Sequence, residues 1–331
     1  MIICKGVIYC SDWHYKFFIF YDIIHIKKYY IIVLLYYCIM YFENLLQRLR
    51  EDSSYDTILK NIVNVFSPYF LCQHFIGDEA WKWGILSKLP PDKNDINSTN
   101  NLSAIQDYDI IQCQLRFFSH FVMNILPAID KKVVLITSGF EYCDFARTEL
   151  TEIVLNHQNV VLWISTNPIY EASEKYMPFP IGFSPFNLSD YTNILLNTEI
   201  TKTDELTHMH LTQTNSCRDL LPKGNKYPAE EFYHNIQKSR FMISPIGDRD
   251  DCYRHYECIG LKTIPISNVS KYYTYIFKEN MYYCDIQKMI EIIDTNQVDY
   301  EYREPNQDLI SYEYHKDIVY KRIQLLKEKN K

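Results

Sequence analysis

The stretch that decides the fold runs from Ser239 to Ile266 and reads SRFMISPIGDRDDCYRHYECIGLKTIPI. Its pattern predicts a strand over 241–244, a turn-rich loop over 245–251, a helix over 252–259 and a second strand over 263–267. A strand, a loop, a helix and a strand in this order form one unit of a parallel sheet. The loop then lies at the carboxyl edge of the sheet, where α/β folds bind ligands.

Short apolar runs alternate with helical segments upstream of this stretch as well. We expect strands over 110–114, 133–137 and 160–165, and helices over 117–126 and 149–156. This alternation predicts a second parallel sheet that is covered on both faces. A length of 331 residues also favours two domains. The sequence therefore predicts an α/β fold with two Rossmann-like domains.

The charge balance excludes one class of partner. The chain has 34 basic and 41 acidic residues, which gives a net charge of -7. Binding to duplex nucleic acid needs a broad basic surface that releases counterions from the phosphates. We therefore expect no nucleic-acid partner, and any anion site has to be local.

The helix over 252–259 carries the residues with the clearest chemistry. Backbone N–H groups at a helix N-terminus attract phosphate, and Gly247 in the loop before it allows a close approach. Arg254 in the first turn is suited to bind a diphosphate in a bidentate manner. Glu257 lies three residues on, hence on the same face, and can accept hydrogen bonds from both ribose hydroxyls. These residues together predict a nucleotide site.

A simpler interpretation of the same residues stays open. Arg254 and Glu257 can form a surface pair worth only ~0.2–0.5 kcal/mol. The three acidic residues that precede the helix, Asp248, Asp250 and Asp251, can cap it, and their charge opposes a bound anion.

The run 239–266 resembles the nucleotide-sugar signature of exostosin-like glycosyltransferases, glycosyltransferase family 47 and its relatives. The positions that match are Ser239, Phe241, Ser244, Pro245, Gly247, Asp251, Cys252, Arg254, Glu257, Ile264, Pro265 and Ile266. A weaker similarity extends the resemblance to residues 105–295. Three positions differ from the pattern: Tyr253 replaces His or Ser, Cys258 replaces Ala, and Lys262 replaces Gly. The last puts the turn before the second strand in doubt, because lysine tolerates a positive φ poorly.

The resemblance implies a GT-B fold, in which two Rossmann-like domains face each other across a cleft. It implies a sugar transfer from a nucleotide diphosphate sugar to a glycan or protein-linked acceptor, without a metal or a further cofactor. Arg254 then binds the diphosphate, Glu257 binds the ribose, and Ser244 and Gly247 line the phosphate loop. The full set of expected donor-binding residues is Ser244, Pro245, Gly247, Arg249, Tyr253, Arg254 and Glu257.

An inverting transferase also needs a base that activates the acceptor. Position in the sequence favours Glu141, ahead of Asp144 and His120. Two other functions stay open: an inactive homologue that only binds a nucleotide or glycan, and a metal-dependent GT-A-like transferase. The latter would use the D-x-D triplets at 107–109 or 248–250, although turn formation explains both more simply. His208-Met-His210 has spacing suited to a metal, but an exposed loop is the better interpretation.

The predicted organisation has four parts. Residues 1–45 form an apolar N-terminal segment, 46–188 the acceptor domain, 189–305 the nucleotide-sugar domain and 306–331 an amphipathic helix. Residues 17–42 are apolar but interrupted by charges, so a membrane anchor of a Golgi or ER type, a buried element in a cytoplasmic protein and a translation start at Met40 all stay open.

Overall fold

The computed structural model describes six stretches of the chain. They are residues 41–77, 93–97, 99–139, 145–197, 199–212 and 214–329. The predicted base Glu141, its alternative Asp144 and residues 17–40 of the apolar segment lie outside these described residues. No helix in the described stretches is both long enough and apolar enough to cross a membrane.

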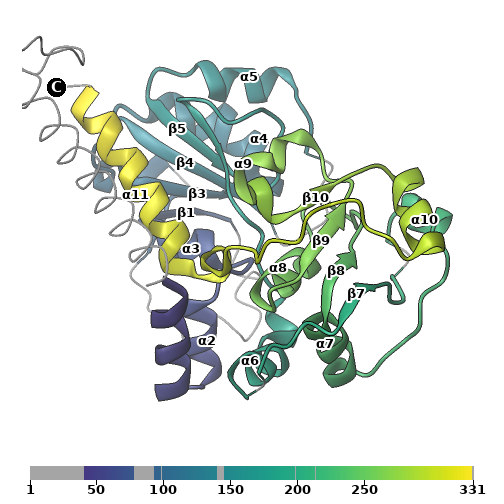
Figure 1. Ribbon diagram of the computed structural model, residues 1–331. Coiled ribbons are helices and arrows are strands. Elements are labelled where there is room, and N and C mark those ends of the chain that lie inside the picture. Colours follow the sequence, from purple (N-terminus) through teal and green to yellow (C-terminus); the bar gives the residue numbers. More distant parts are fainter. Residues whose placement is uncertain are drawn as a thin grey trace, which may run out of the picture.

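The first sheet has six parallel strands in the order β2-β1-β3-β4-β5-β6 (Figure 1). The strand order reverses between β1 and β3, as in doubly wound folds. The strands are β1 (His74–Ile76), β2 (Asn94–Asp95), β3 (Ile110–Gln114), β4 (Val133–Ser138), β5 (Val160–Ser165) and β6 (Tyr176–Pro178). The three predicted strands of this region agree with β3, β4 and β5 to within one residue.

The second sheet has four parallel strands in the order β10-β9-β8-β7. They are β7 (Asp204–Thr207), β8 (Ser239–Ile243), β9 (Ile264–Ser267) and β10 (Tyr282–Tyr283). The predicted strand–loop–helix–strand unit is therefore β8, its loop, α8 and β9. Lys262 does adopt a positive φ of 59° at the turn before β9, so the turn forms despite the lysine. The Tyr302 hydroxyl donates to the Lys262 carbonyl at 2.7 Å and helps to hold it.

Helices pack on both sheets. Residues 41–51 are helical, and the further α-helices are α2 (Tyr55–Asn61), α3 (Ser67–Leu71), α4 (Phe118–His120), α5 (Glu149–Asn156), α6 (Leu188–Asn197), α7 (Ala229–Lys238), α8 (Tyr253–Gly260), α9 (Thr274–Phe277), α10 (Ile286–Thr295) and α11 (Tyr312–Lys329). The helix predicted over 117–126 is instead α4 followed by a π-helical turn, Phe121–Ile125, and a 3₁₀ turn, Leu126–Ala128. Pro127 lacks the N–H that a regular helix needs at this point.

The polar stretch 189–226, for which the pattern of apolar residues predicts irregular structure, is in fact partly regular. It contains α6, whose residues Tyr191, Ile194 and Leu195 are buried at helical spacing, and the edge strand β7. A search for apolar runs does not detect these two elements. The outer face of α6 is charged and polar, and β7 is half-exposed.

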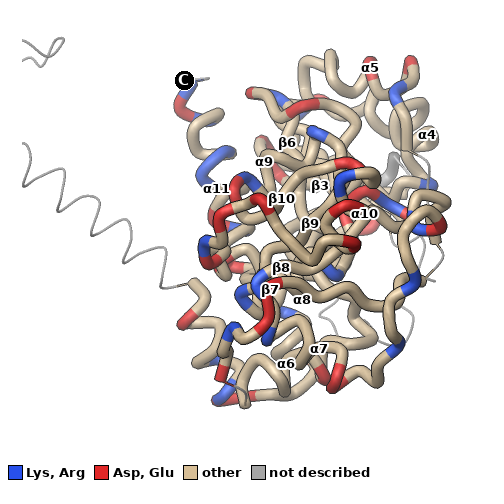
Figure 2. Tube along the Cα trace, turned by 45° about the vertical axis from the view of Figure 1, so that its right-hand side comes forward, with Lys and Arg blue, Asp and Glu red and all other residues tan. Residues whose placement is uncertain are grey.

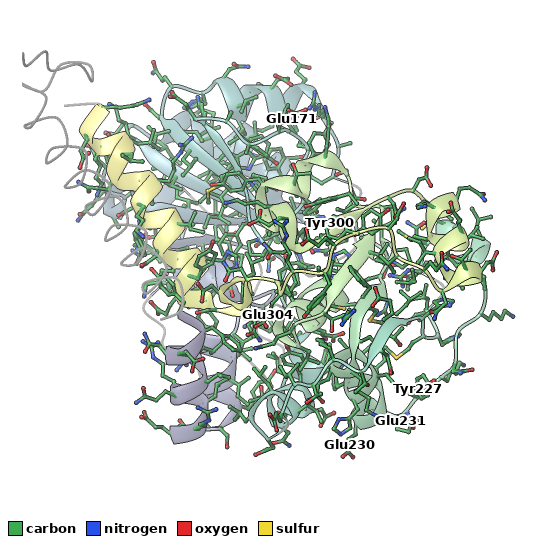
Figure 3. All side chains as sticks on the ribbon, viewed as in Figure 1. Glu171, Tyr227, Glu230, Glu231, Tyr300 and Glu304 are labelled. Carbon is green, nitrogen blue, oxygen red and sulfur yellow. The ribbon has the colours of Figure 1, made fainter. Side chains whose placement is uncertain are left out.

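The carboxyl edges of the two sheets face each other. Arg249, after β8, donates to the carbonyl of Gly139, which follows β4, at 2.7 Å. Lys271 forms an ion pair with Glu171, which lies on the rim of the first domain in Figure 3. A buried apolar cluster includes residues of both sheets together with α6 and α11. The structure thus confirms the predicted fold class, an α/β GT-B architecture of two Rossmann-like domains.

The chain returns to the first domain at its C-terminal end. Figure 1 shows α11 along the side of the first sheet, and the Lys327 ammonium lies 5.3 Å from the Tyr108 ring centroid there. Figure 2 shows basic and acidic residues interspersed along the described part of the trace.

One buried carboxylate joins the first described helix to this returning segment. Asp308 is only 2% exposed, its Oδ1 accepts from the Phe42 backbone N–H at 2.9 Å, and its Oδ2 has no hydrogen-bond partner among the described residues. Burial raises the pKa of Asp308 to about 6. Above that pH the folded state therefore holds a charge that it solvates poorly.

We expect Asp308→Asn to stabilise the fold in a pH-dependent way. The folded-state pKa is raised, so the unfavourable charge develops as pH rises from about 4 through 6 and persists above. The free energy of unfolding of the variant should exceed that of the wild type by about 1–2 kcal/mol at pH 8 and match it near pH 4. Urea unfolding at several pH values measures this, with the exposed Asp294→Asn as a control. A difference that is constant with pH would contradict the prediction.

Candidate functional site

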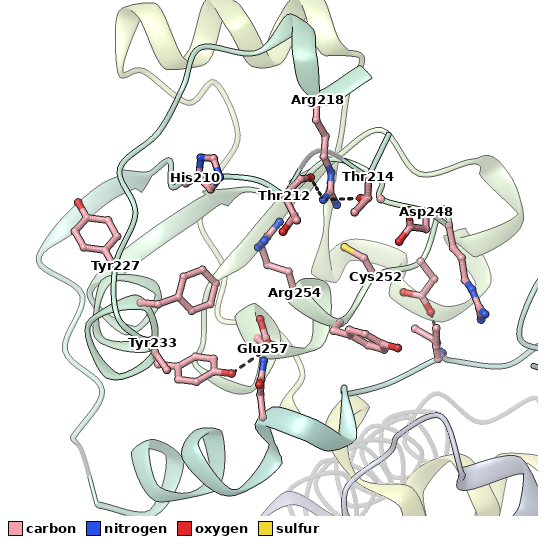
Figure 4. Close-up of a pocket in the computed structure, with 18 residues that line it drawn as sticks. His210, Thr212, Thr214, Arg218, Tyr227, Tyr233, Asp248, Cys252, Arg254 and Glu257 are labelled. Carbon is pink, nitrogen blue, oxygen red and sulfur yellow. Dashed lines mark hydrogen bonds between the residues drawn. The ribbon is translucent and has the colours of Figure 1, made fainter. Parts of the chain in front are cut away.

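A pocket of about 610 Å³ opens beside the N-terminus of α8 (Figure 4). It is lined by Ile181, Asn187, His210, Thr212, Thr214, Arg218, Tyr227, Ala229, Phe232, Tyr233, Gly247, Asp248, Arg249, Asp251, Cys252, Tyr253, Arg254 and Glu257. Five of the seven expected donor-binding residues are in this set. The walls come from the loop after β8, α8, α7 and the segment that follows β7.

A buried network fixes the loop after β8. The Asp251 carboxylate, 2% exposed, accepts from the Tyr256 hydroxyl at 2.6 Å and from the Ile181 backbone N–H at 2.9 Å. His255 Nε2 lies 3.0 Å from the Ser244 carbonyl oxygen. The first turn of α8 is thereby tied to the end of β8 and to the segment that follows β6. The loop has one defined shape before any ligand binds.

The acidic residues before α8 do not act as its cap, because the N-cap residue is Cys252. Asp251 is engaged in the network above, and Asp250 accepts from the Ser270 backbone N–H at 3.2 Å. Asp248 is exposed at the pocket. The expected conflict with a bound anion is thus reduced, because two of the three carboxylates are committed elsewhere.

Burial opposes the charged form of His255, but the adjacent Cys252 and Asp251 outweigh it and raise the pKa of His255 to about 10. Burial likewise opposes the Cys252 thiolate, yet His255 and the nearby arginines leave the pKa of Cys252 lowered. His255 thus carries a positive charge that is matched by Cys252 and Asp251, and the cluster adds no net positive charge to the N-terminus of α8.

Arg254 and Glu257 both face the pocket (Figure 4). The Arg254 guanidinium lies 5.9 Å from the Phe232 ring centroid, and its Nε is buried without a hydrogen-bond partner. Glu257 is 6% exposed and accepts from the Tyr233 hydroxyl at 3.3 Å. Burial raises the pKa of Glu257, while Arg254 and the Tyr233 hydrogen bond act in the opposite direction. Glu257 is buried and forms no salt bridge with Arg254, so the two residues are not the surface pair of the simpler interpretation.

Arg218 completes the pocket and has no signal in the sequence. Its side chain is 9% exposed and donates to three carbonyl oxygens and one hydroxyl. These acceptors are the carbonyls of Thr212, Pro245 and Ile246 at 2.9, 3.2 and 2.8 Å, and Thr214 Oγ1 at 3.0 Å. Arg218 is 27 residues from Pro245 in the chain, so sequence spacing could not bring the two together.

The glycine of the loop is needed for this contact. A Cβ on Gly247 would lie 2.7 Å from Arg218 Nη2, so any larger residue displaces the guanidinium. The prediction that Gly247 lets the backbone approach a phosphate stays a prediction; in the structure the Arg218 guanidinium lies against this glycine. Ser244 and Pro245 do not line the pocket, and Ser244 is fully buried against α8 and β9. Their part in donor binding stays a prediction.

Arg249 extends away from α8 and toward the first domain. It donates to the Gly139 carbonyl at 2.7 Å and to Asn167 Oδ1 at 3.4 Å. Tyr253 lines the pocket. Whether either residue contacts a donor stays a prediction, and the bonds of Arg249 to Gly139 and Asn167 link the two domains.

The remaining candidates lie apart from one another. His120 is exposed on α4, with Nε2 3.0 Å from the Asn97 carbonyl oxygen, and does not line the pocket. Asp107 accepts from the Lys132 N–H, and Asp109 lies 2.8 Å from His74 Nε2. No group of three or more metal-ligating side chains occurs among the described residues.

The expectation that His208 and His210 lie on an exposed loop is wrong. Both are half-buried, His210 lines the pocket, and the Nε2 of His208 is buried. Burial lowers the pKa of His208, and Arg254 adds to this effect. The segment after β7 packs against the pocket because the 210 and 225 backbones pair, which local sequence does not reveal.

Comparison with known proteins gives limited information. No family model and no curated protein matches the chain. Among solved structures, the crystal structure of a GtfA/B complex is similar with a TM-score of 0.33 at 12% identity. The match covers 69% of this chain, and the chain spans only 59% of the length of that one. The resemblance to exostosin-like enzymes thus rests on the motif around α8 alone.

Proposed function

We propose that the protein is a glycosyltransferase that takes its sugar from a nucleotide diphosphate sugar and passes it to a glycan or protein-linked acceptor. The observation that carries the proposal is the pocket at the N-terminus of α8. There Arg218 and Arg254, which form no salt bridge with a described residue, lie near the buried Glu257. A nucleotide diphosphate offers both kinds of matching group, namely anionic phosphates and ribose hydroxyls.

The electrostatics of the pocket favour a diphosphate leaving group. Among the described residues, the arginines in salt bridges are Arg240 and Arg303, so Arg218 and Arg254 have no such partner there. Charge develops on the diphosphate as the bond to the sugar breaks, and fixed positive groups at a helix N-terminus stabilise it. In this proposal Arg254 holds the diphosphate and needs no metal ion to do so.

Glu257 has the position for the ribose. It lies one turn after Arg254, at the bottom of the pocket in Figure 4, with the Tyr233 hydroxyl beside it. A carboxylate that already accepts one hydrogen bond retains acceptor sites for both ribose hydroxyls. The base that activates the acceptor is proposed to be Glu141, which follows β4 in the sequence.

A thermal-shift screen tests this function. UDP or GDP in the presence of EDTA should raise the melting temperature, because a ligand that binds only the folded state stabilises it. Stabilisation that appears only with manganese would favour the metal-dependent alternative. Nucleotide binding without donor hydrolysis would favour the inactive homologue. No stabilisation by any nucleoside diphosphate would contradict the proposal.

We expect Arg254→Ala to weaken UDP or GDP binding by about a hundredfold, because a charged hydrogen bond to phosphate is lost in a partly buried site. The fold should persist, since the guanidinium packs near the Phe232 ring and forms no salt bridge with a described residue. Isothermal titration calorimetry measures the change. Arg240→Ala is the matched control, because Arg240 lies on β8 outside the pocket. An unchanged affinity in the Arg254 variant would remove this residue from the site.

Glu257→Gln should weaken recognition of the ribose and leave recognition of the phosphates unchanged. We expect about tenfold weaker binding of UDP and little change for inorganic pyrophosphate, because only the nucleotide has a ribose. Glu230→Gln serves as control, since Glu230 is exposed on α7 and projects away from the body of the molecule in Figure 3. Equal losses for both ligands would show that Glu257 does not act through the ribose.

A further inference from the structure

Residues 212 and 214–218 form a wall of the pocket that the motif around α8 does not include. They contribute the Thr212, Thr214 and Arg218 side chains to the lining. In Figure 4 the guanidinium of Arg218 points between Thr212 and Thr214, and the guanidinium of Arg254 lies on the other side of Thr212. Two cationic groups from distant parts of the chain therefore meet at this wall.

Among the described residues Arg218 forms no salt bridge, although Cys252 and Asp248 lie near enough to favour its charge. The side chain is more than nine-tenths buried, and all four of its acceptors are neutral. A guanidinium has five N–H groups, so one on Nη2 remains after these four bonds. Nη2 is also the atom that approaches Gly247 at the pocket wall.

The neighbouring cation makes this arrangement costly without a ligand. Burial lowers the pKa of Arg218 and Arg254 adds to this effect, whereas Cys252 and Asp248 oppose it. The Nε of Arg254 is itself buried without a hydrogen-bond partner among the described residues. A buried charge normally has a partner of opposite sign. Two like charges held together by neutral acceptors are balanced best by an anion that carries at least two charges.

We propose that Arg218 is a second phosphate-binding residue and that the pocket distinguishes two linked phosphates from one. Arg254 and the N-terminus of α8 hold one phosphate group, and the free N–H of Arg218 holds the other. This inference rests on the proposed function for its ligand class. Arg218 would then have two roles. It binds the carbonyls of Pro245 and Ile246, which holds the loop, and it provides the positive charge for the second phosphate.

Inorganic pyrophosphate and orthophosphate are the probes that test this assignment. Calorimetry in EDTA on the full chain should show that the wild type binds pyrophosphate at least about tenfold more tightly than orthophosphate. Arg218→Gln should abolish this preference while orthophosphate affinity stays within about threefold, because only the second phosphate loses its partner. Arg218→Lys keeps the charge and should retain most of the preference.

A purely structural role gives a different pattern. Lysine and glutamine both lose the forked hydrogen bonds of Arg218, so loss of the preference in both variants would overturn the proposal. Asn215 lies outside the pocket lining, and Asn215→Ala removes the bond from Asn215 Nδ2 to the Gly247 carbonyl at 3.0 Å and leaves the charge of Arg218. This variant should lower the melting temperature but keep the preference for pyrophosphate, and loss of the preference there would equally overturn the proposal.

Failure of this inference is distinguishable from failure of the proposed function. If the preference follows the charge at position 218 but neither UDP nor GDP binds, the two-phosphate site stands and the nucleotide proposal is wrong. If UDP binds and Arg218→Gln leaves the pyrophosphate preference unchanged, Arg218 is no phosphate ligand and the nucleotide site remains.

Discussion

The buried carboxylate of Asp251 is the interaction on which the arrangement of the pocket depends. It accepts from Tyr256 on α8 and from the backbone of Ile181, which belongs to the segment after β6. One side chain thus fixes the first turn of α8 to the first domain. Removal of one partner from such a buried polar group leaves the rest unsatisfied, so the shape of the loop and the relation of the domains are linked.

The same loop faces both sheets. On one side Arg218 holds its carbonyls, and on the other side Arg249 donates to the first domain at Gly139. A ligand that binds to this loop therefore touches the element that joins the two carboxyl edges. A ligand bound in this pocket can therefore favour the orientation in which the two domains face each other.

Much of the fold could be predicted, because it rests on local patterns. The strands β3, β4, β5, β8 and β9 are short apolar runs between turn residues, and α8 lies between such runs. The short strands β1, β2 and β10, with at most three residues each, are too brief for a periodic signal. α6 and β7 were missed because polar residues dominate their outer faces.

The site divides in the same way. Arg254, Glu257 and Gly247 belong to one motif, so spacing along a helix indicated their shared face. Arg218 lies in the segment after β7 and Tyr233 lies on α7, and both reach the pocket through tertiary packing. A sequence pattern within one segment does not predict such packing. The expectation for Ser244 followed the motif, whereas burial against β9 placed it behind the pocket.

A crystal structure of the full chain with UDP in the absence of metal tests the central claim most directly. The account predicts density for the diphosphate between the guanidinium groups of Arg254 and Arg218, with the ribose against the Glu257 carboxylate. Density for UDP elsewhere on the protein, or at this pocket with the diphosphate turned away from both arginines, would contradict it.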